Sequence, residues 1–191
     1  MNHSQDLLAK YAALIRSWAP RLDLVSPADL ERLEERHIED SLRVVPLLDE
    51  LPPGPCVDIG SGAGFPGVPL AIARPERRWT LIEPRKLRAA FLDEVVRELE
   101  LDCEVVRATA EQCGARAGYR ATHVLATARA VADPIEIRSL AAPFLMPGGI
   151  VLVFTGEQYE YVERRPPEAV EWRPGLTIME KPLEAEPEEG T

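Results

Sequence analysis

One short stretch of the chain, VDIGSGAGFPG at residues 57–67, combines an acid with four glycines and is suited to holding a small ligand. Glycine alone adopts positive φ freely, and without side chains a flat ligand can approach the main chain. The turn reads D-x-G-x-G-x-G, whereas a dinucleotide-binding turn, G-x-G-x-x-G, needs a glycine where Phe65 stands. A nicotinamide-dependent oxidoreductase is therefore disfavoured.

Two carboxylates flank this turn and indicate the kind of nucleoside. Asp58, just before the glycines, would repel a pyrophosphate but favour a cationic group. Glu83 ends the next predicted strand, where an acid commonly accepts the ribose hydroxyls. S-adenosylmethionine has no phosphate and carries an ammonium and a sulfonium, so it suits both acids. We expect Asp58 at its amino-acid end, Glu83 at its ribose, and the turn glycines Gly60, Gly62 and Gly64 against it.

Strands and helices alternate on either side of this turn, which predicts an α/β fold with a mostly parallel, doubly wound sheet and helices on both faces. The predicted strands cover residues 56–60, 77–84, 103–110, 123–130 and 148–156, with a last one at 176–180. A short helix is expected from residue 67 and ends before Pro75, and another ends near Met146. A long amphipathic helix over 85–101 has an apolar stripe at Leu87, Phe91, Val95 and Leu99.

A helical segment is predicted before the sheet. Apolar residues at helical spacing indicate a helix over residues 4–18. Ser26 as N-cap and Pro27 at the first helical position begin one or two further helices, which extend to about Leu51. The sequence PPGP then ends them. We expect three parts: a helical segment (1–51), a cofactor-binding domain (52–182) and an acidic tail (183–191).

The composition limits the partners. The net charge of −10 argues, by itself, against a nucleic-acid partner, so a polyanion would need a local basic patch. The candidate residues for such a patch are Arg16, Arg21, Arg36, Arg85 and Arg88. The three cysteines form no C-x-x-C pair, and we expect neither a metal nor a disulfide framework. The sequence contains no apolar run as long as a membrane span and starts without a signal-peptide pattern, so we expect a cytoplasmic protein.

Six segments resemble, in order, those of the bacterial RsmG (GidB) family, the small-subunit ribosomal RNA guanine-N7 methyltransferases. They are SWAPRLDLVS, ERHIEDSL, VDIGSGAGFPGVPLAIARPE, KLRAAFLDEVVRELEL, RATAEQ and ATARAVA, and the resemblance covers roughly residues 10–156. The most specific feature is GAGFPG after VDIGS together with the upstream H-x-x-D-S at His37, Asp40 and Ser41.

This resemblance implies a Rossmann-like class I methyltransferase fold that uses S-adenosylmethionine. By position, it implies cofactor contacts from Gly60, Phe65, Ala110, Glu111 and Arg129, with Glu111 beside the adenine. It also implies methylation of N7 of a guanine in 16S ribosomal RNA, with ribosomal RNA or the small subunit as partner, and we expect a monomer. Phe65 is the aromatic residue expected near the mouth of the site.

Methyl transfer to guanine N7 does not need an ionisable side chain as an acid or a base. Guanine N7 carries an exposed lone pair and attacks a methyl sulfonium without losing a proton. We therefore expect no general base and no catalytic residue in the strict sense, only positioning. His37, Asp40 and Ser41 share one helical turn and cannot form a relayed triad. Either they attach the N-terminal helices to the sheet, or they border the cofactor mouth.

The match departs from the family pattern at two strand ends. His123 and TARA stand where the family has an acid before SRA, and FTG at residues 154–156 lacks the usual lysine. Two alternatives therefore stand beside the RNA methyltransferase. One is a homologue that binds S-adenosylmethionine but has lost RNA activity, and the other is a small-molecule methyltransferase whose N-terminal helices act as a lid.

Overall fold

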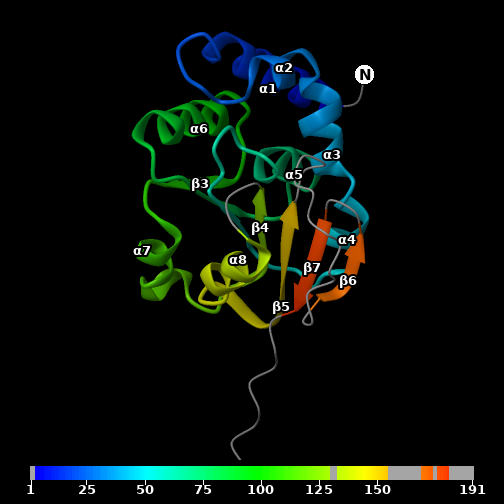
Figure 1. Cartoon of the computed structure of the whole chain (residues 1–191), viewed down its shortest axis with the longest axis vertical. Coiled ribbons are helices and arrows are strands. Elements are labelled where there is room, and N and C mark those ends of the chain that lie inside the picture. Colours follow the sequence, from blue (N-terminus) through cyan, green and yellow to red (C-terminus); the bar gives the residue numbers. More distant parts are fainter. Residues whose placement is uncertain (1–2, 130–132, 155–168, 174–175, 181–191) are drawn as a thin grey trace, which may run out of the picture.

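The computed structural model describes residues 3–129, 133–154, 169–173 and 176–180, which form an α/β fold on one seven-stranded sheet (Figure 1). The strand order is β3-β2-β1-β4-β5-β7-β6. The strands are β1 (Cys56–Ile59), β2 (Trp79–Ile82), β3 (Cys103–Val106), β4 (His123–Arg129), β5 (Leu145–Phe154), β6 (Ala169–Arg173) and β7 (Leu176–Glu180).

The first five strands are parallel, as the alternating pattern predicts. The chain order reverses between β1 and β4, so the connections after these two strands leave in opposite directions, which is where open α/β sheets have their ligand-binding crevice. Ile59 pairs with Ile82 on one side and with Ala128 on the other. The residues that follow them, Gly60, Glu83 and Arg129, therefore meet at one edge of the sheet.

The last two strands run antiparallel to their neighbours and complete the sheet. The predicted strand at 176–180 is confirmed as β7, which pairs with β5. Strand β6 was not predicted because it is five residues long, contains Glu171 and Arg173, and in the sequence follows Pro167 closely and directly precedes Pro174. A short strand that carries charged residues and is flanked in the sequence by prolines suits the sheet edge that it occupies.

Helices cover both faces of the sheet because alternate residues of each strand point into two separate cores, one on each face. Cys56 and Leu81 face the core shared with α5 (Gly67–Ala73) and α6 (Lys86–Glu98). Val57 and Ile82 face the core shared with α7 (Ala110–Gly114) and α8 (Pro134–Ala141). A 3₁₀ turn, η2 (Ala117–Tyr119), follows α7. The two-sided burial explains the continuous apolar runs in these strands.

Two details of the predicted helices are wrong. Leu87, placed in the apolar stripe of α6, is 59% exposed, and the buried face begins two residues later at Ala89. The first turn of α6 therefore lies beyond the core. Helix α8 ends at Ala141, not near Met146, because Pro143 disfavours a helical conformation at the residue before it and β5 already begins at Leu145.

The N-terminal segment is helical where predicted, but in more pieces. Helix α1 (His3–Trp18) is followed by α2 (Pro27–Glu31), a π-helical turn η1 (Glu34–Glu39), α3 (Asp40–Leu42) and α4 (Val45–Glu50). The Ser26 side chain caps α2, as its sequence indicates. Pro46 prevents a continuous helix to residue 51 because it has no main-chain N–H to bond to the carbonyl four residues before it, and it stands instead in the first turn of α4. In Figure 1, α1 and α2 lie at the end of the molecule toward which the arrows of β4 and β5 point.

The segment and the sheet share a core instead of forming separate units. Tyr11 and Ile15 of α1 belong to the same buried cluster as Leu81 of β2. Arg77, only 8% exposed, also joins the two parts: its guanidinium donates hydrogen bonds to the carbonyl oxygens of Leu48, Leu51 and Pro52 at 2.7, 3.0 and 2.9 Å. It thereby satisfies main-chain acceptors at the end of α4. The boundary at residue 51 stays a prediction.

We expect R77M to lower the free energy of unfolding by about 2 kcal/mol or more, because buried carbonyl oxygens lose their donor. Arg78 provides a matched control: it is an exposed neighbour, and its ion pairs with described residues are long, 4.0 Å to Asp102 and 3.8 Å to Glu104. R78M should change the stability by less than about 1 kcal/mol. Urea unfolding followed by circular dichroism measures both, and equal losses in the two variants would contradict the role given to Arg77.

Candidate functional site

The glycine turn has the backbone that its sequence predicts. Gly60, Gly62 and Gly64 have φ values of +69°, +57° and +103°, in the region that disfavours side chains. The Ser61 N–H donates to the Ile82 carbonyl of β2, and the Gly64 N–H donates back to the Ser61 carbonyl. The turn therefore passes across the carboxyl end of β1, toward β2. Its main chain is open at Gly62, where a Cβ would meet no atom nearer than 3.7 Å, whereas the side chains of Tyr11 and Val68 fill the space beside Gly64.

Glu83 holds this turn directly. Its carboxylate accepts the Gly62 N–H at 2.9 Å through Oε2 and the Arg85 N–H at 2.8 Å through Oε1. The side chain is buried, and the pairing of β1 with β2 places it beside the turn. A carboxylate oxygen accepts more than one hydrogen bond, so each oxygen of Glu83 keeps acceptor capacity for a ligand hydroxyl. Contact with a ribose stays a prediction.

Asp58 lies in β1 beneath the turn and is completely buried. Its Oδ1 accepts a hydrogen bond from the Thr127 hydroxyl at 2.7 Å, whereas Oδ2 has no hydrogen-bond partner among the described residues. Burial raises the pKa of this carboxyl to about 6, although the Thr127 hydrogen bond and the charge of Arg129 partly offset the effect. A buried, half-satisfied carboxylate is a favourable neighbour for a cation.

Arg129 lies at the end of β4 and faces the N-terminal helices. Its guanidinium forms an ion pair with Asp40 at 2.6 Å, donates to the Ser41 hydroxyl at 3.4 Å and lies over the Phe154 ring, 4.6 Å from its centroid. Its Nε is buried without a hydrogen-bond partner in the described part of the chain. One donor of Arg129 therefore remains available, and its predicted cofactor contact stays a prediction.

The H-x-x-D-S residues attach the N-terminal helices to the sheet. Asp40 and Ser41 hold Arg129, and the Ser41 hydroxyl donates to the His37 main-chain carbonyl, not to its ring. The His37 ring stacks on Phe65 at 4.8 Å, and burial, with help from the charge of Arg129, lowers its pKa. The three side chains form no Ser–His–Asp relay, in agreement with the sequence analysis.

Phe65 occupies a different place from the one expected. Its ring is 5% exposed and packs between His37 and Tyr11, with centroids 4.8 and 5.5 Å away. The expectation of an aromatic plane at the mouth is therefore wrong, because the ring serves to join α1 and η1 to the turn. A ligand contact at Phe65 would come from its main chain, and it stays a prediction.

Ala110 and Glu111 begin α7, on the connection that follows β3. Thr109 caps this helix in a capping box with Gln112, which fixes the two predicted residues at its first turn. Ala110 is buried and Glu111 is exposed. Because β3 pairs in parallel with β2, the helix start lies at the same edge of the sheet as Glu83. Contacts of both residues with an adenine stay predictions.

The predicted basic residues are partly engaged within the protein. Arg16 pairs with Glu34 at 2.7 Å and Arg36 with Asp29 at 3.3 Å. Arg88, in the first turn of α6, donates to the Asp23 carbonyl. Arg21 and Arg85 are exposed. The start of α6 thus brings positive charge close to the turn, since Arg85 immediately follows the Glu83-Pro84 dipeptide.

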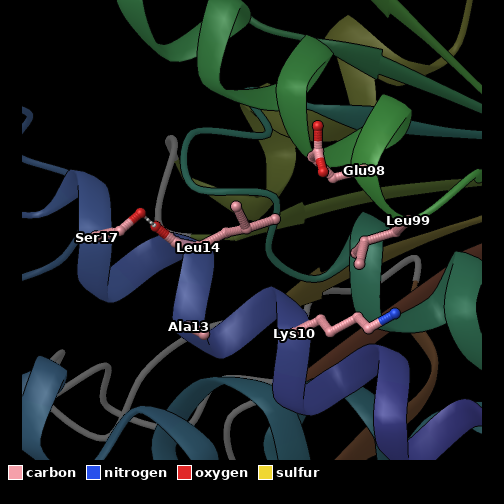
Figure 2. Close-up of a pocket in the computed structure, with 6 residues that line it drawn as sticks. All are labelled: Lys10, Ala13, Leu14, Ser17, Glu98 and Leu99. Atoms are coloured by element: carbon pink, nitrogen blue, oxygen red, sulfur yellow. Dashed lines mark hydrogen bonds between the residues drawn. The ribbon is translucent and has the colours of Figure 1, made fainter.

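A separate hollow of about 360 Å³ lies between α1 and the end of α6 (Figure 2). Its lining comes from both helices: Lys10, Ala13, Leu14, Ser17, Glu98 and Leu99. None of these residues belongs to the predicted site. Groups of three or more metal-ligating side chains are absent from the described part of the chain, as are helices long and apolar enough to cross a membrane.

Comparison with solved structures defines the class of fold. A methyltransferase from Geobacter sulfurreducens superposes with a TM-score of 0.60, covering 92% of this chain and 90% of that chain at 11% identity. The yhhF protein of Escherichia coli gives a TM-score of 0.59 over 85% of this chain and 91% of that chain at 16% identity. The fold is the Rossmann-like α/β fold of class I methyltransferases, as predicted.

Sequence comparison defines the family. The chain belongs to the GidB family, described as rRNA small subunit methyltransferase G, which matches residues 4–171. The ribosomal RNA small subunit methyltransferase G of Mycobacterium leprae strain TN is 43% identical over 80% of this chain and 61% of its own length. The protein of that name from Granulibacter bethesdensis is 37% identical over 95% and 80%. The chain thus spans about three fifths of the length of the first of these relatives.

The pKa of Asp58 yields a stability test. A carboxyl whose pKa rises from 3.8 to about 6 on folding stabilises the fold when protonated, and this contribution is lost as the pH rises through 6. Relative to D58N, the wild type should lose about 1.4 kcal/mol of unfolding free energy between pH 5 and pH 7.5. Urea unfolding of both proteins at both pH values measures this difference, and a pH-independent difference would contradict the assignment.

Proposed function

We propose that this protein transfers a methyl group from S-adenosylmethionine to N7 of a guanine in 16S ribosomal RNA. Membership of the GidB family is the observation that carries this proposal. The relatives of Mycobacterium leprae and Granulibacter bethesdensis are named as ribosomal RNA small subunit methyltransferases, and the chain aligns with them over most of its own length. The fold and the arrangement at the edge of its sheet support the same function.

The residues at this edge fit the methyl donor. A flat nucleoside with a cationic end suits the open main chain at Gly62, the Glu83 carboxylate beside it and the buried carboxylate of Asp58 beneath the turn. In the proposal, Glu83 accepts hydrogen bonds from the ribose hydroxyls, and the negative charge of Asp58 attracts the ammonium group of the ligand. Ala110, Glu111, Arg129 and the Phe65 main chain complete the binding surface. When bound, S-adenosylmethionine supplies an electrophilic methyl group.

Catalysis in this proposal is positioning. The N7 lone pair needs no deprotonation, so the protein contributes alignment of the purine with the donor and exclusion of water. His37, the histidine nearest the turn, is held uncharged by burial and stacks on Phe65, which suits a packing role and not proton transfer. We therefore assign no general base.

Binding of the RNA substrate would depend on local positive charge. The exposed Arg21 and Arg85 are the candidates for phosphate contacts, since the net charge of −10 offers no general attraction. The pairing of Arg16 and Arg36 with acids favours a second candidate, a methyltransferase that acts on a small molecule. A homologue that binds the cofactor without RNA activity would share these contacts.

We expect E83Q to weaken binding of S-adenosylhomocysteine about tenfold or more, because an amide supplies only one acceptor atom where the ribose and two main-chain N–H groups meet. E98Q is a matched control, since Glu98 lies on the exposed surface of α6 and has Arg97 as its ion-pair partner among the described residues. Isothermal titration calorimetry measures both variants. Equal affinities of E83Q and E98Q would remove Glu83 from the cofactor site.

Methyl transfer is tested with radiolabelled S-adenosylmethionine and small ribosomal subunits from a strain that lacks the N7-methylguanine. The proposal predicts label in 16S RNA at one N7-methylguanine, located by chemical cleavage at that base, with deproteinised RNA assayed in parallel. A protein that binds S-adenosylmethionine but leaves both RNA substrates unlabelled would contradict RNA methylation and favour the small-molecule or binding-only alternatives.

A further inference from the structure

The phenol of Tyr11 reaches from the N-terminal segment into the glycine turn. Tyr11 lies in the middle of α1, is fully buried, and donates a hydrogen bond from its hydroxyl to the main-chain carbonyl of Ala63 at 2.7 Å. The two residues are 52 positions apart in the sequence. Ala63 lies between two glycines of positive φ, Gly62 and Gly64. The bond therefore attaches α1 to the part of the turn with the greatest conformational freedom.

The fit around this hydroxyl is close. A Cβ atom on Gly64 would lie 2.7 Å from the Tyr11 hydroxyl oxygen, so the phenol occupies the space that this glycine leaves open. The Tyr11 ring also packs against Phe65 at 5.5 Å, one residue further along the turn. Burial, reinforced by the charge of Asp58, raises the pKa of Tyr11 well above 10, which keeps the hydroxyl protonated as a donor.

The turn is thus held by side chains from two directions. From β2 and its extension, Glu83 accepts the Gly62 N–H; from α1, Tyr11 donates to the Ala63 carbonyl. These two contacts fix the donor of one residue and the acceptor of the next. Glycine-rich turns lose much conformational entropy when ordered, so such contacts determine how much of that loss is incurred before a ligand binds.

We propose that Tyr11 is a positioning residue of the cofactor site, which preorganises the turn at Gly62–Gly64 for S-adenosylmethionine through the Ala63 carbonyl. The N-terminal segment is then part of the cofactor-binding unit and not only a lid for substrate. The ion pair of Asp40 with Arg129 agrees with this, because it attaches the same N-terminal segment to the end of β4, the neighbour of β1 on the side opposite β2. The proposal rests on the proposed function.

The test compares Y11F with Y119F in the full chain. Tyr119 is the matched control: its hydroxyl also donates a 2.7 Å hydrogen bond, to Glu104, but on β3 away from the turn. We expect Y11F to bind S-adenosylhomocysteine about tenfold more weakly than the wild type, and Y119F to bind it normally. Without ligand, hydrogen exchange in the peptide over residues 58–67 should be faster in Y11F than in Y119F, after correction for global stability.

Three results would overturn the proposal, in distinguishable ways. If the wild type binds S-adenosylhomocysteine and Y11F binds equally well, with unchanged exchange at residues 58–67, Tyr11 only packs and the proposed function stands. If the wild type does not bind S-adenosylhomocysteine, the proposed function itself fails and the turn is no cofactor site. A lower melting temperature of Y11F without a change in affinity also counts against positioning.

Should Y11F not fold, the wild type labelled with 3-fluorotyrosine replaces it. The chain has four tyrosines, so the Tyr11 fluorine signal is assigned by elimination with the Phe variants of Tyr119, Tyr159 and Tyr161. We expect S-adenosylhomocysteine to shift the signal of Tyr11 and leave that of Tyr119 unchanged. An unshifted Tyr11 signal at saturation would overturn the proposal.

Discussion

The hydrogen bond from the Gly62 N–H to the Glu83 carboxylate is the interaction on which the candidate site depends. It joins the end of β2 to a turn whose three glycines occupy backbone conformations that other residues adopt only with strain. Parallel pairing of β1 with β2 brings the two partners together, and the reversal of strand order between β1 and β4 opens the space beside them. Without this bond, the turn would lose its contact with the Glu83 side chain, and the carboxylate would be left with the Arg85 N–H as its main-chain donor.

Buried charge is the second constraint, and it connects the site to the N-terminal segment. Asp58 beneath the turn is unfavourably buried as a carboxylate, which its raised pKa reflects. Arg129, at the neighbouring strand end, is balanced by Asp40 of α3. Such charges are tolerable inside a protein only when paired. The ion pair with Arg129 therefore favours packing of the N-terminal segment, which supplies Asp40, against the sheet. A cationic ligand near Asp58 would relieve the remaining imbalance.

Much of this arrangement is predictable from sequence because it is local. The glycine turn, the strands on either side and the cap at Ser26 follow from residue types at fixed spacing. The strand predicted over 103–110 is too long, because β3 ends at Val106 and Thr109 caps α7. The contacts of Tyr11 with Ala63 and of Asp40 with Arg129 join residues far apart in the chain, and no local pattern marks them. The burial of the Phe65 ring was missed for the same reason, since its neighbours His37 and Tyr11 come from other helices.

The most direct test of the central claim is a crystal structure of the protein with S-adenosylhomocysteine. The account predicts the nucleoside across the Gly60–Gly64 turn, its ribose hydroxyls on Glu83 and its ammonium toward Asp58, with the bonds from Gly62 and Tyr11 retained. A crevice that stays empty at saturating ligand, or one that instead takes up a phosphorylated nucleotide, would contradict it.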